Sequence, residues 1–263
     1  MYEPRGIMRA PAPLPLRATV WGEPPDRPRL QPGVVHVWRA SLAVDAGCLA
    51  ELLGTLSGHE MREAARCRFP EDRDRAIASR GFLRQLLASY LDRRPSDLVI
   101  SRGPFGKPYL VTEDVGLHFS LAHSGGLALY AFTLEKEVGI DLQQSVPIDL
   151  EELVSAGFLS DGERRELLPL AGPRRQEALL RCWTRKEAYI KALGQGLSAP
   201  LQDIEVTVAL GHAALLRTDS GTEGAGRWLL MDLDPAPGYA ACVAWEREAA
   251  LTCWAWSRPA PLA

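Results

Sequence analysis

The clearest pattern of hydrophobic and polar positions lies between residues 74 and 91. Its apolar members recur at spacings of three and four residues, which places them on one face of an α-helix. The pattern therefore predicts a helix over Asp74–Leu91 that packs by this face against a core. The members of the face are Leu83, Leu86, Leu87, Tyr90 and Leu91.

Shorter apolar runs between turn residues predict the remaining elements. We expect helices at residues 49–56, 150–158, 162–168 and 175–193, the last one ended by Gly194 at the C′ position that glycine fills without steric penalty. We expect strands at residues 34–38, 99–100, 117–121, 127–134, 138–142, 204–208, 213–216, 228–233 and 239–245. The segment His123–Gly126 is interpreted as a turn between two of these strands. No internal repeat is evident in the sequence.

The first 33 residues differ in composition from the rest of the chain. They contain eight prolines, and proline disrupts both regular helices and central strands. We therefore expect residues 1–33 to form an extended, partly disordered leader. The folded part is expected to begin at Val34.

Charge and cysteine content exclude several classes of protein. Thirty basic and thirty-three acidic side chains give a net charge of −3, which argues against a nucleic-acid binder that relies on bulk positive charge. The five cysteines form no C-x-x-C pair, so a reducing cytoplasm is favoured over a disulfide framework or a zinc ribbon. No signal peptide is expected, because the N-terminus has no apolar core flanked by basic residues. The longest uncharged stretch, Val115–Leu134, is interpreted as two strands and a turn, not as a membrane span.

Two pairs of polar residues have the chemistry that a divalent metal and a phosphate require. Glu187 and Lys191 lie four residues apart and project from one side of a helix, while Asp141 and Gln143 share one face of a strand. Mg²⁺ typically takes one or two carboxylates together with waters and substrate phosphates. Asp141 and Glu187 are therefore candidate ligands, and Gln143 can add a neutral oxygen. The plainer alternatives are a surface ion pair on the helix and a turn cap on the strand.

Two further candidates stand in glycine-containing turns. His123 precedes a Ser-Gly-Gly segment, and Lys107 lies between Gly106 and Pro108. A histidine at a turn is most often a local hydrogen-bonding residue, and a lysine in such a loop is usually solvated. Alternatively, Lys107 is a point charge on a rigid loop, which suits a phosphate.

Taken in chain order, these signals form a specific set of motifs. G-K-P is followed by F-S-L-A-H-S, then by G-I-D, and then by W-x-x-K-E-A-x-x-K-x-x-G-x-G-L. This order resembles the 4′-phosphopantetheinyl transferase superfamily, and the length resembles its Sfp-type members. The resemblance covers residues 34 to about 210. The four motifs begin at Gly106, Phe119, Gly139 and Trp183.

The resemblance implies an α+β fold, a pseudo-twofold pair of similar α+β lobes with the active site in the cleft between them. We accordingly expect an N-terminal lobe over residues 34–136 and a C-terminal lobe over residues 137–263. The expected protein is a cytoplasmic monomer that binds coenzyme A and an apo carrier protein, an ACP or PCP domain, and neither nucleic acid nor membrane.

The resemblance also implies a Mg²⁺-dependent group transfer. The phosphopantetheine arm of coenzyme A moves to a serine hydroxyl of the carrier, and adenosine 3′,5′-bisphosphate leaves. Coenzyme A brings about four negative charges, counting roughly two for its phosphomonoester. Fixed cations and Mg²⁺ must offset these charges before a hydroxyl approaches phosphorus.

Residue by residue, the motifs assign the roles of the site. Asp141 and Glu187 match the metal carboxylates of the family, Glu187 is also where the general base is often placed, and Lys191 matches the lysine that reaches the pyrophosphate. Gln143 stands where the Sfp-type pattern usually has a third acidic ligand, so the metal site carries one negative charge fewer. Glu163 matches a further acidic position and is a weaker candidate for the base.

Other positions match contacts to coenzyme A. Lys107 and His123 occupy two of them, and Ala122 replaces a serine often found before this histidine, so one hydroxyl contact is expected to be missing. Arg75 and Arg80 fall in the basic helix that usually helps to bind the 3′-phosphate, and the sequence does not decide between them.

Two other functions fit parts of the sequence. Gln143 motivates a coenzyme-A-binding module without transfer activity, and the plainest alternative is an unrelated α+β interaction protein. The length disfavours the short trimeric class that serves primary fatty-acid synthesis. We therefore expect carriers of polyketide, peptide or other secondary pathways, with residues 150–170 as part of their docking surface.

Overall fold

The first half of the chain forms a sheet covered by helices. The structure is a computed structural model that describes residues 19–25, 27–111, 116–194, 196, 201–218, 221–246 and 249–256. In chain order its first elements are β1 (Val34–Ser41), α1 (Ala46–Thr55), α2 (Gly58–Ala65), α3 (Pro70–Leu91), the 3₁₀ turn η1 (Pro95–Asp97), β2 (Ile100–Arg102), β3 (Pro108–Leu110), β4 (Leu117–Ser124) and β5 (Leu127–Leu134).

The second half repeats this order of elements and adds α7 and β11. It runs through β6 (Val138–Gln144), α4 (Leu150–Ser155), α5 (Asp161–Leu167), α6 (Gly172–Leu193), η3 (Leu201–Asp203), β7 (Glu205–Val206), β8 (Leu215–Arg217), α7 (Gly221–Ala225), β9 (Trp228–Leu233), β10 (Tyr239–Glu246) and β11 (Ala250–Ala255). In both halves a strand leads to two short helices, a long helix, a 3₁₀ turn, a short hairpin and two long strands. The expected α+β fold with two similar lobes is confirmed.

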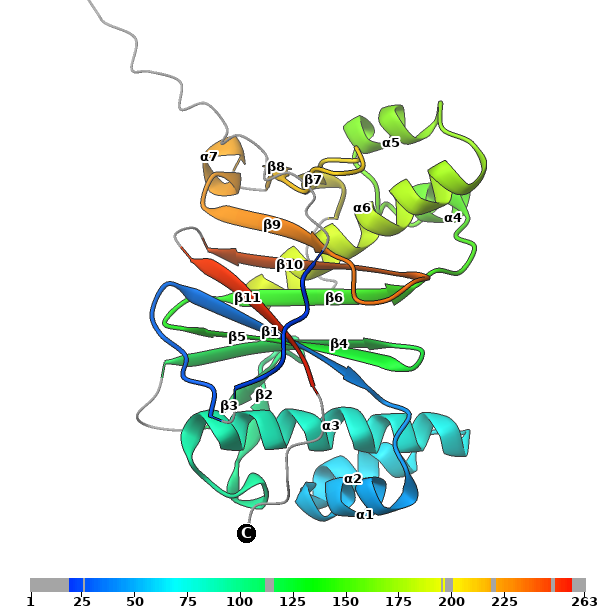
Figure 1. Ribbon diagram of the computed structural model, residues 1–263. Helices are drawn as coiled ribbons and strands as arrows, with labels where there is room; N and C mark the ends of the chain where they lie inside the picture. Colours follow the sequence, from blue (N-terminus) through cyan, green and yellow to red (C-terminus); the bar gives the residue numbers. More distant parts are fainter. Residues whose placement is uncertain are drawn as a thin grey trace, which may run out of the picture.

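The two long sheets lie between two layers of helices (Figure 1). One sheet has the strand order β11-β1-β5-β4 and the other has the order β6-β10-β9. Helices α1, α2 and α3 cover the outer face of the first sheet, and α6 covers the outer face of the second (Figure 1). The apolar alternation of β6 fits this position, because Val138, Ile140 and Leu142 are fully buried between the sheets.

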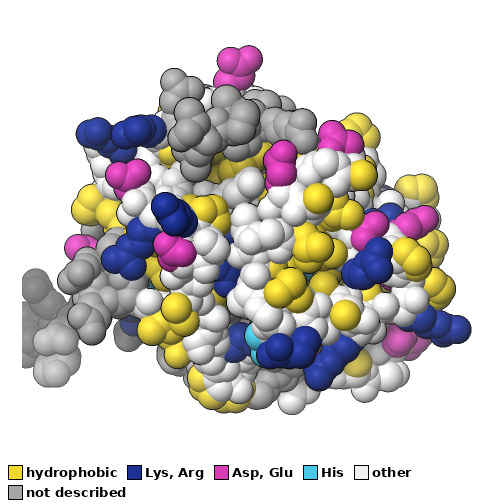
Figure 2. Space-filling model, turned by 90° about the horizontal axis from the view of Figure 1, so that it is seen from below, with side chains coloured by type: hydrophobic (Ala, Val, Ile, Leu, Met, Phe, Trp, Pro, Cys, Tyr) yellow, Lys and Arg dark blue, Asp and Glu magenta, His cyan; other side chains and the backbone are white. Residues whose placement is uncertain are grey.

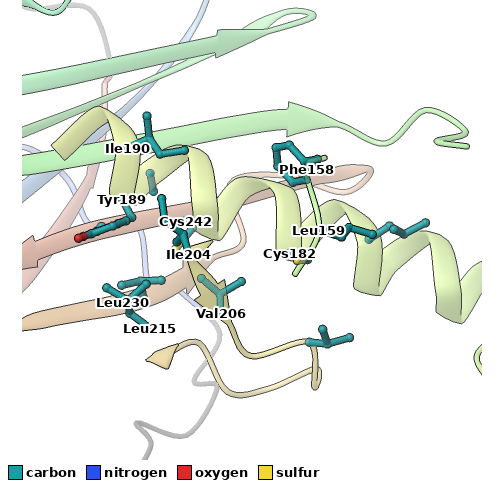
Figure 3. Close-up of a cluster of buried hydrophobic side chains, with 14 of the residues drawn as sticks. Phe158, Leu159, Cys182, Tyr189, Ile190, Ile204, Val206, Leu215, Leu230 and Cys242 are labelled. Carbon is teal, nitrogen blue, oxygen red and sulfur yellow. The ribbon is translucent and has the colours of Figure 1, made fainter. Parts of the chain in front are cut away.

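Three apolar cores hold the layers together. One lies between α3 and the first sheet and includes Leu86, Leu87 and Phe132, while the second, around Val37 and Val243, joins the two sheets. The third lies between α6 and the second sheet (Figure 3); ten of its members are Phe158, Leu159, Cys182, Tyr189, Ile190, Ile204, Val206, Leu215, Leu230 and Cys242. Because the middle core is continuous, the two halves pack as one body.

Several expected boundaries move. The helix expected from residue 74 begins at Pro70, since proline is tolerated in the first turn. Strand β4 continues to Ser124, so His123 lies on a strand and the turn itself is Gly125–Gly126. Helix α2 was not expected, although Ser57 and Glu60 form a capping box at its start.

The C-terminal strand and the leader both cross to the other half. β11 pairs in parallel with β1, so it lies in the sheet of the first half, a feature that the expected division at residue 137 does not include. Residues 1–18 and 26 of the expected leader lie outside the described residues. Within the described part, Trp21 donates to the carbonyl of Asp234 at 2.9 Å and Gly22 pairs with Trp254, and the expectation of a partly disordered leader stays a prediction.

The face that carries α1, α2 and α3 mixes charges of both signs with apolar side chains (Figure 2). Lysine and arginine side chains gather toward the lower edge of this view, next to a histidine (Figure 2). Within the described residues, no helix is both long and apolar enough to cross a bilayer.

Candidate active site

Strand β6 and helix α6 approach each other closely at Gly139. A Cβ atom at this position would lie 1.9 Å from the carbonyl oxygen of Ala188 and 2.3 Å from the amide nitrogen of Ala192. Both neighbours are backbone atoms of α6, so only glycine fits without moving the helix. Alternate residues of a strand share a face, so Gly139, Asp141 and Gln143 all point toward α6, away from the core between the sheets.

Asp141 is held by two donors. Its side chain is only 2% exposed, and Lys191 donates from Nζ to Oδ1 at 2.6 Å. Gln143 donates from Nε2 to Oδ2 at 3.2 Å. The sequence predicted that these residues lie near one another, but the alternative of an ion pair between Glu187 and Lys191 is not what the structure contains, because Lys191 pairs with the strand.

Glu187 lies one turn before Lys191 on α6 and is half-buried. Burial and the negative charge of Asp141 raise the pKa of Glu187, and the charge of Lys191 opposes this rise. Within the described part of the chain, its carboxylate forms no hydrogen bond or ion pair, in contrast to that of Asp141. The two carboxylates are thus close enough to interact electrostatically. That of Asp141 is paired with Lys191, whereas that of Glu187 has no partner among the described residues.

A pocket of about 230 Å³ opens beside Glu187 and Lys191. Both halves of the chain line it: the β2–β3 loop and β4 form one wall, and the C-terminal half of α6 forms the other. The lining residues are Phe105, Gly106, Lys107, Pro108, Ser120, Leu121, Glu187, Ile190, Lys191, Gly194 and Gly196. Leu197 of the sequence motif lies outside the described residues.

His123 lies near cations of both long helices. Desolvation lowers its pKa, and the charges of Lys191 and Arg80 lower it further, so these three side chains are electrostatically coupled. Arg80 itself donates to the carbonyl of Glu60 at 2.9 Å. Arg75, in contrast, pairs with Glu71 and Asp72 on its own helix. Of the two arginines left open by the sequence, Arg80 is therefore the one near the other basic candidates.

Lys107 joins the two halves. Its Nζ donates to Glu137 at 2.6 Å and to the carbonyl of Ala192 at 2.8 Å. Glu137 also contacts Nδ1 of His118 at 3.1 Å. Burial alone would raise the pKa of Glu137, but hydrogen bonds from His118 and Lys107 together with their charges lower it to about 2. Lys107 lines the pocket while its ammonium group is bound to the second half.

From the sequence, Glu163 is a weaker candidate for the base, and Lys186 has no assigned role. The two form an ion pair at 2.6 Å in which both side chains are 0% exposed. Glu163 also caps α5 and accepts from the amide of Val206, while Lys186 donates to the carbonyls of Phe158 and Leu201. A carboxylate in this position has no access to a substrate hydroxyl. The Ser160-x-x-Glu163 capping box was the available sequence signal.

No group of three or more His, Cys, Asp or Glu side chains suited to a metal occurs among the described residues. Asp141 and Glu187 are the two carboxylates of the site, and the amide of Gln143 contacts Asp141. Carboxylate and amide oxygens are donors that Mg²⁺ accepts, and it is commonly held by one or two carboxylates. The donor set therefore fits a hard divalent cation.

Comparisons with known proteins identify the family of the chain. A model of the 4′-phosphopantetheinyl transferase superfamily matches residues 137–244, and a model of the N-terminal part of 4′-phosphopantetheinyl transferases matches residues 45–134. The chain is 37% identical over 227 residues to the 4′-phosphopantetheinyl transferase HetI of Nostoc sp., which covers 85% of this chain and 92% of HetI.

Two further relatives carry the same description. A putative 4′-phosphopantetheinyl transferase of Synechocystis sp. is 35% identical over 195 residues, 72% of this chain and 79% of the relative. The 4′-phosphopantetheinyl transferase Sfp of Bacillus subtilis is 32% identical over 149 residues, 56% of this chain and 64% of Sfp.

Proposed function

Since this chain belongs to the 4′-phosphopantetheinyl transferase superfamily, we propose that the pocket beside Glu187 and Lys191 is its active site. The protein is a 4′-phosphopantetheinyl transferase, which moves the 4′-phosphopantetheine arm to a carrier protein. The observation that carries the assignment of the site is that Glu187 and Lys191 line one pocket wall, with Asp141 bound to Lys191 behind it. The acceptor is a serine hydroxyl, and the arm comes from coenzyme A.

Glu187 takes the proton of the acceptor hydroxyl. It lines the pocket and its carboxylate is not engaged by another described side chain, whereas Glu163 is buried and Asp141 is paired with Lys191. A serine hydroxyl is a poor nucleophile until a base removes its proton, and such a base typically contributes about 10²–10⁴-fold to the rate. The oxygen then attacks the β-phosphorus, and the bond to the α-phosphate breaks to release adenosine 3′,5′-bisphosphate.

Cations of both halves offset the charge of coenzyme A. Lys191 lies at the pocket wall next to Asp141. There it stabilises the negative charge that develops on the α-phosphate oxygen of the departing adenosine 3′,5′-bisphosphate. His123 and Arg80 form the basic side of the same region and bind the 3′-phosphate. Lys107 lines the opposite wall and contributes its charge from the first half.

Asp141 and Glu187 would hold a Mg²⁺ ion, with Gln143 next to them as a neutral donor. The fit rests on two like-charged carboxylates on adjacent elements, whose repulsion a cation relieves. A bound Mg²⁺ supplies charge neutralisation for the diphosphate group.

The same observations support a monomer in the cytoplasm. A single chain supplies both walls of the pocket. The first half contributes Lys107, Ser120 and Leu121, and the second half contributes Glu187, Ile190 and Lys191. All five cysteines are free thiols, as expected in a reducing compartment. Carriers of secondary pathways dock on residues 150–170, where Leu168, at the end of α5, is 49% exposed.

Mass spectrometry of a carrier tests the proposal. The protein is incubated with coenzyme A, Mg²⁺ and a panel of apo ACP and PCP domains, and the expected result is a carrier mass gain equal to one phosphopantetheine arm. Asp141→Ala should nearly abolish this gain, because it removes a carboxylate that no other described side chain replaces. Gln143→Glu should preserve transfer and lower the Mg²⁺ concentration needed, since it restores a negative charge.

The outcomes separate the competing functions. Binding of coenzyme A without any transfer would favour the binding module that Gln143 motivates. Absence of coenzyme A binding would favour an unrelated interaction protein. Wild-type transfer by the Asp141→Ala protein would reject the assignment of the site while leaving the family activity in place.

A further inference from the structure

Side chains at alternate positions of β4 face the second sheet. Ser120 and Ala122 are 4% and 5% exposed, and Ala122 packs in the core between the two sheets. The positions between them point the other way: Leu121 packs against the core between α3 and the first sheet, and His123 lies near Arg80 of α3. The side chains at 120, 122 and 124 therefore form a row directed toward β6.

Two of these side chains bind the backbone of β6. The hydroxyl of Ser120 accepts from the amide of Ile140 at 3.1 Å, and the hydroxyl of Ser124 accepts from the amide of Gln144 at 2.9 Å. Both bonds join residues that lie twenty positions apart in the chain. β4 and β6 belong to different sheets, and β6 pairs through its other edge with β10. Serine hydroxyls thus take the place of a backbone ladder where the two sheets meet.

Asp141 lies between the two bonded amides. The ladder with β10 and the close contact of Gly139 with α6 set which residues of β6 face α6 and Lys191. The two hydroxyl bonds add the register of β6 against β4, and a shift by one residue would break both of them. Ser120 is also a pocket-lining residue, and the lobes carry Lys107 on one wall and Lys191 on the other. The register of β6 against β4 therefore sets the position of Asp141 relative to the wall supplied by the first half.

The same geometry assigns a place to Ala122. The amides of Ile140 and Gln144 point toward β4, and by alternation along the strand the amide of Leu142 points there too. A constant offset of twenty residues puts Ala122 opposite Leu142. A methyl group cannot accept a hydrogen bond. A serine at this position would face β6 and complete the row, instead of contacting coenzyme A as the family resemblance suggests.

We propose that the hydroxyls of Ser120 and Ser124 are positioning groups that fix the register of β6 against β4, and so hold Asp141 and its partner Lys191 in place relative to the pocket wall of the first half, and that Ala122 is an unfilled third member of this row. The part that concerns Asp141 rests on the proposed function. The part that concerns the seam between the sheets rests only on the hydrogen bonds and the alternation of β4.

Amide hydrogen exchange and metal dependence test the two serines. Ser120→Ala should raise the exchange rate of the Ile140 amide about tenfold, as loss of one hydrogen bond predicts, and should raise the Mg²⁺ concentration for half-maximal transfer about tenfold. Ser120→Thr, which keeps the hydroxyl, should restore both. The matched control is Ser101→Ala, since the hydroxyl of this serine in β2 forms no hydrogen bond within the described residues, and it should change neither. Unchanged exchange and Mg²⁺ dependence in Ser120→Ala would overturn the proposal.

Ala122→Ser tests the third position without removing a contact. The added hydroxyl should slow exchange of the Leu142 amide and raise the Tm by about 2–4 °C, with no change in the Kd for coenzyme A. A tighter Kd at an unchanged Tm would place the hydroxyl on the substrate and contradict the proposal. If the unsubstituted protein transferred no phosphopantetheine, only the proposed function would be rejected. The exchange and Tm measurements test the hydrogen bonds between β4 and β6 independently of activity.

Discussion

Helices α3 and α6 invite a direct comparison of the two halves. Both have 22 residues and a proline in the first turn, and in each the fifteenth residue is a buried cation. Arg84 of α3 donates to Glu60 at 2.8 Å, and Lys186 of α6 pairs with Glu163 at 2.6 Å. Each glutamate belongs to a capping box on the second short helix of its half.

The halves differ one residue further along each helix. The sixteenth and twentieth positions are Glu187 and Lys191 in α6, but Gln85 and Ser89 in α3. Ser89 bonds only to the carbonyl of Leu86 in its own helix. β1 carries no acidic residue, whereas the corresponding β6 carries Asp141.

The outer edges of these two strands differ as well. The edge of β1 is covered by β11, whereas the edge of β6 meets β4 through serine hydroxyls next to the pocket. The features that both halves share are those that hold a long helix in place on a sheet. The features found in the second half alone are the side chains proposed to bind the substrate and to react with it. The comparison therefore separates residues that build a lobe from residues that build the site.

The largest expected effect concerns the sixteenth helix position. Glu187→Ala should reduce the rate of carrier modification by about 10²–10⁴-fold or abolish it, because it removes the base. The matched change in the other half, Gln85→Ala, should leave the rate unchanged. Single-turnover transfer to an apo carrier, followed by mass spectrometry, measures both. Wild-type rates in Glu187→Ala would show that the position is no more functional in α6 than in α3.

The next effect concerns the buried cations, and it is measured as stability. Lys186→Met leaves Glu163 charged and fully buried, a change that typically costs about 3–5 kcal/mol. Arg84→Met should cost less, because the Glu60 side chain is 15% exposed and water can reach it. Urea unfolding of both variants measures the difference.

A double variant provides the control for this comparison. Adding Glu163→Gln to Lys186→Met removes the unpaired charge and should recover part of the lost stability. Equal losses in the two halves, or no recovery in the double variant, would show that burial of the pair does not control the cost.

The sequence predicts the parts of this molecule that depend on local order. The period of α3, the end of α6 at Gly194 and the convergence of Asp141 with Lys191 are all expected from spacing and motifs, and the structure contains them. The roles of Lys186 and Ser120 depend on partners that are distant in the chain. A rule based on spacing along the chain identifies a residue, but it does not identify a partner that is distant in the sequence.

The similarity of the two halves is expected from the family resemblance, but no repeat is evident in the residue letters themselves. The similarity lies in the order of elements and in residue pairs such as Arg84 with Glu60 and Lys186 with Glu163, whose side chains differ in type. Matching letters cannot reveal a pair in which arginine replaces lysine. The two capping boxes are the local signal that both halves share.

The smallest expected effect concerns the contact that joins the halves. The ordinary pKa of a glutamate is 4.5, and that of Glu137 is lowered to about 2, so its bonds to Lys107 and His118 stabilise the fold fully above pH 4.5. The stabilisation is lost as the pH falls from 4.5 toward 2, because the unfolded chain takes up the proton first. Since the carboxylate is 42% exposed, solvent screening limits its contribution to about 0.2–1 kcal/mol.

Glu137→Gln should therefore flatten the dependence of unfolding free energy on pH between 4.5 and about 2. Urea unfolding at a series of pH values at low salt measures this slope, and added salt should shrink the difference from the wild type. Glu166→Gln removes an exposed carboxylate within one half and should leave the slope unchanged. If Glu137→Gln instead lost stability equally at all pH values, the contact between the halves would depend on shape and not on charge.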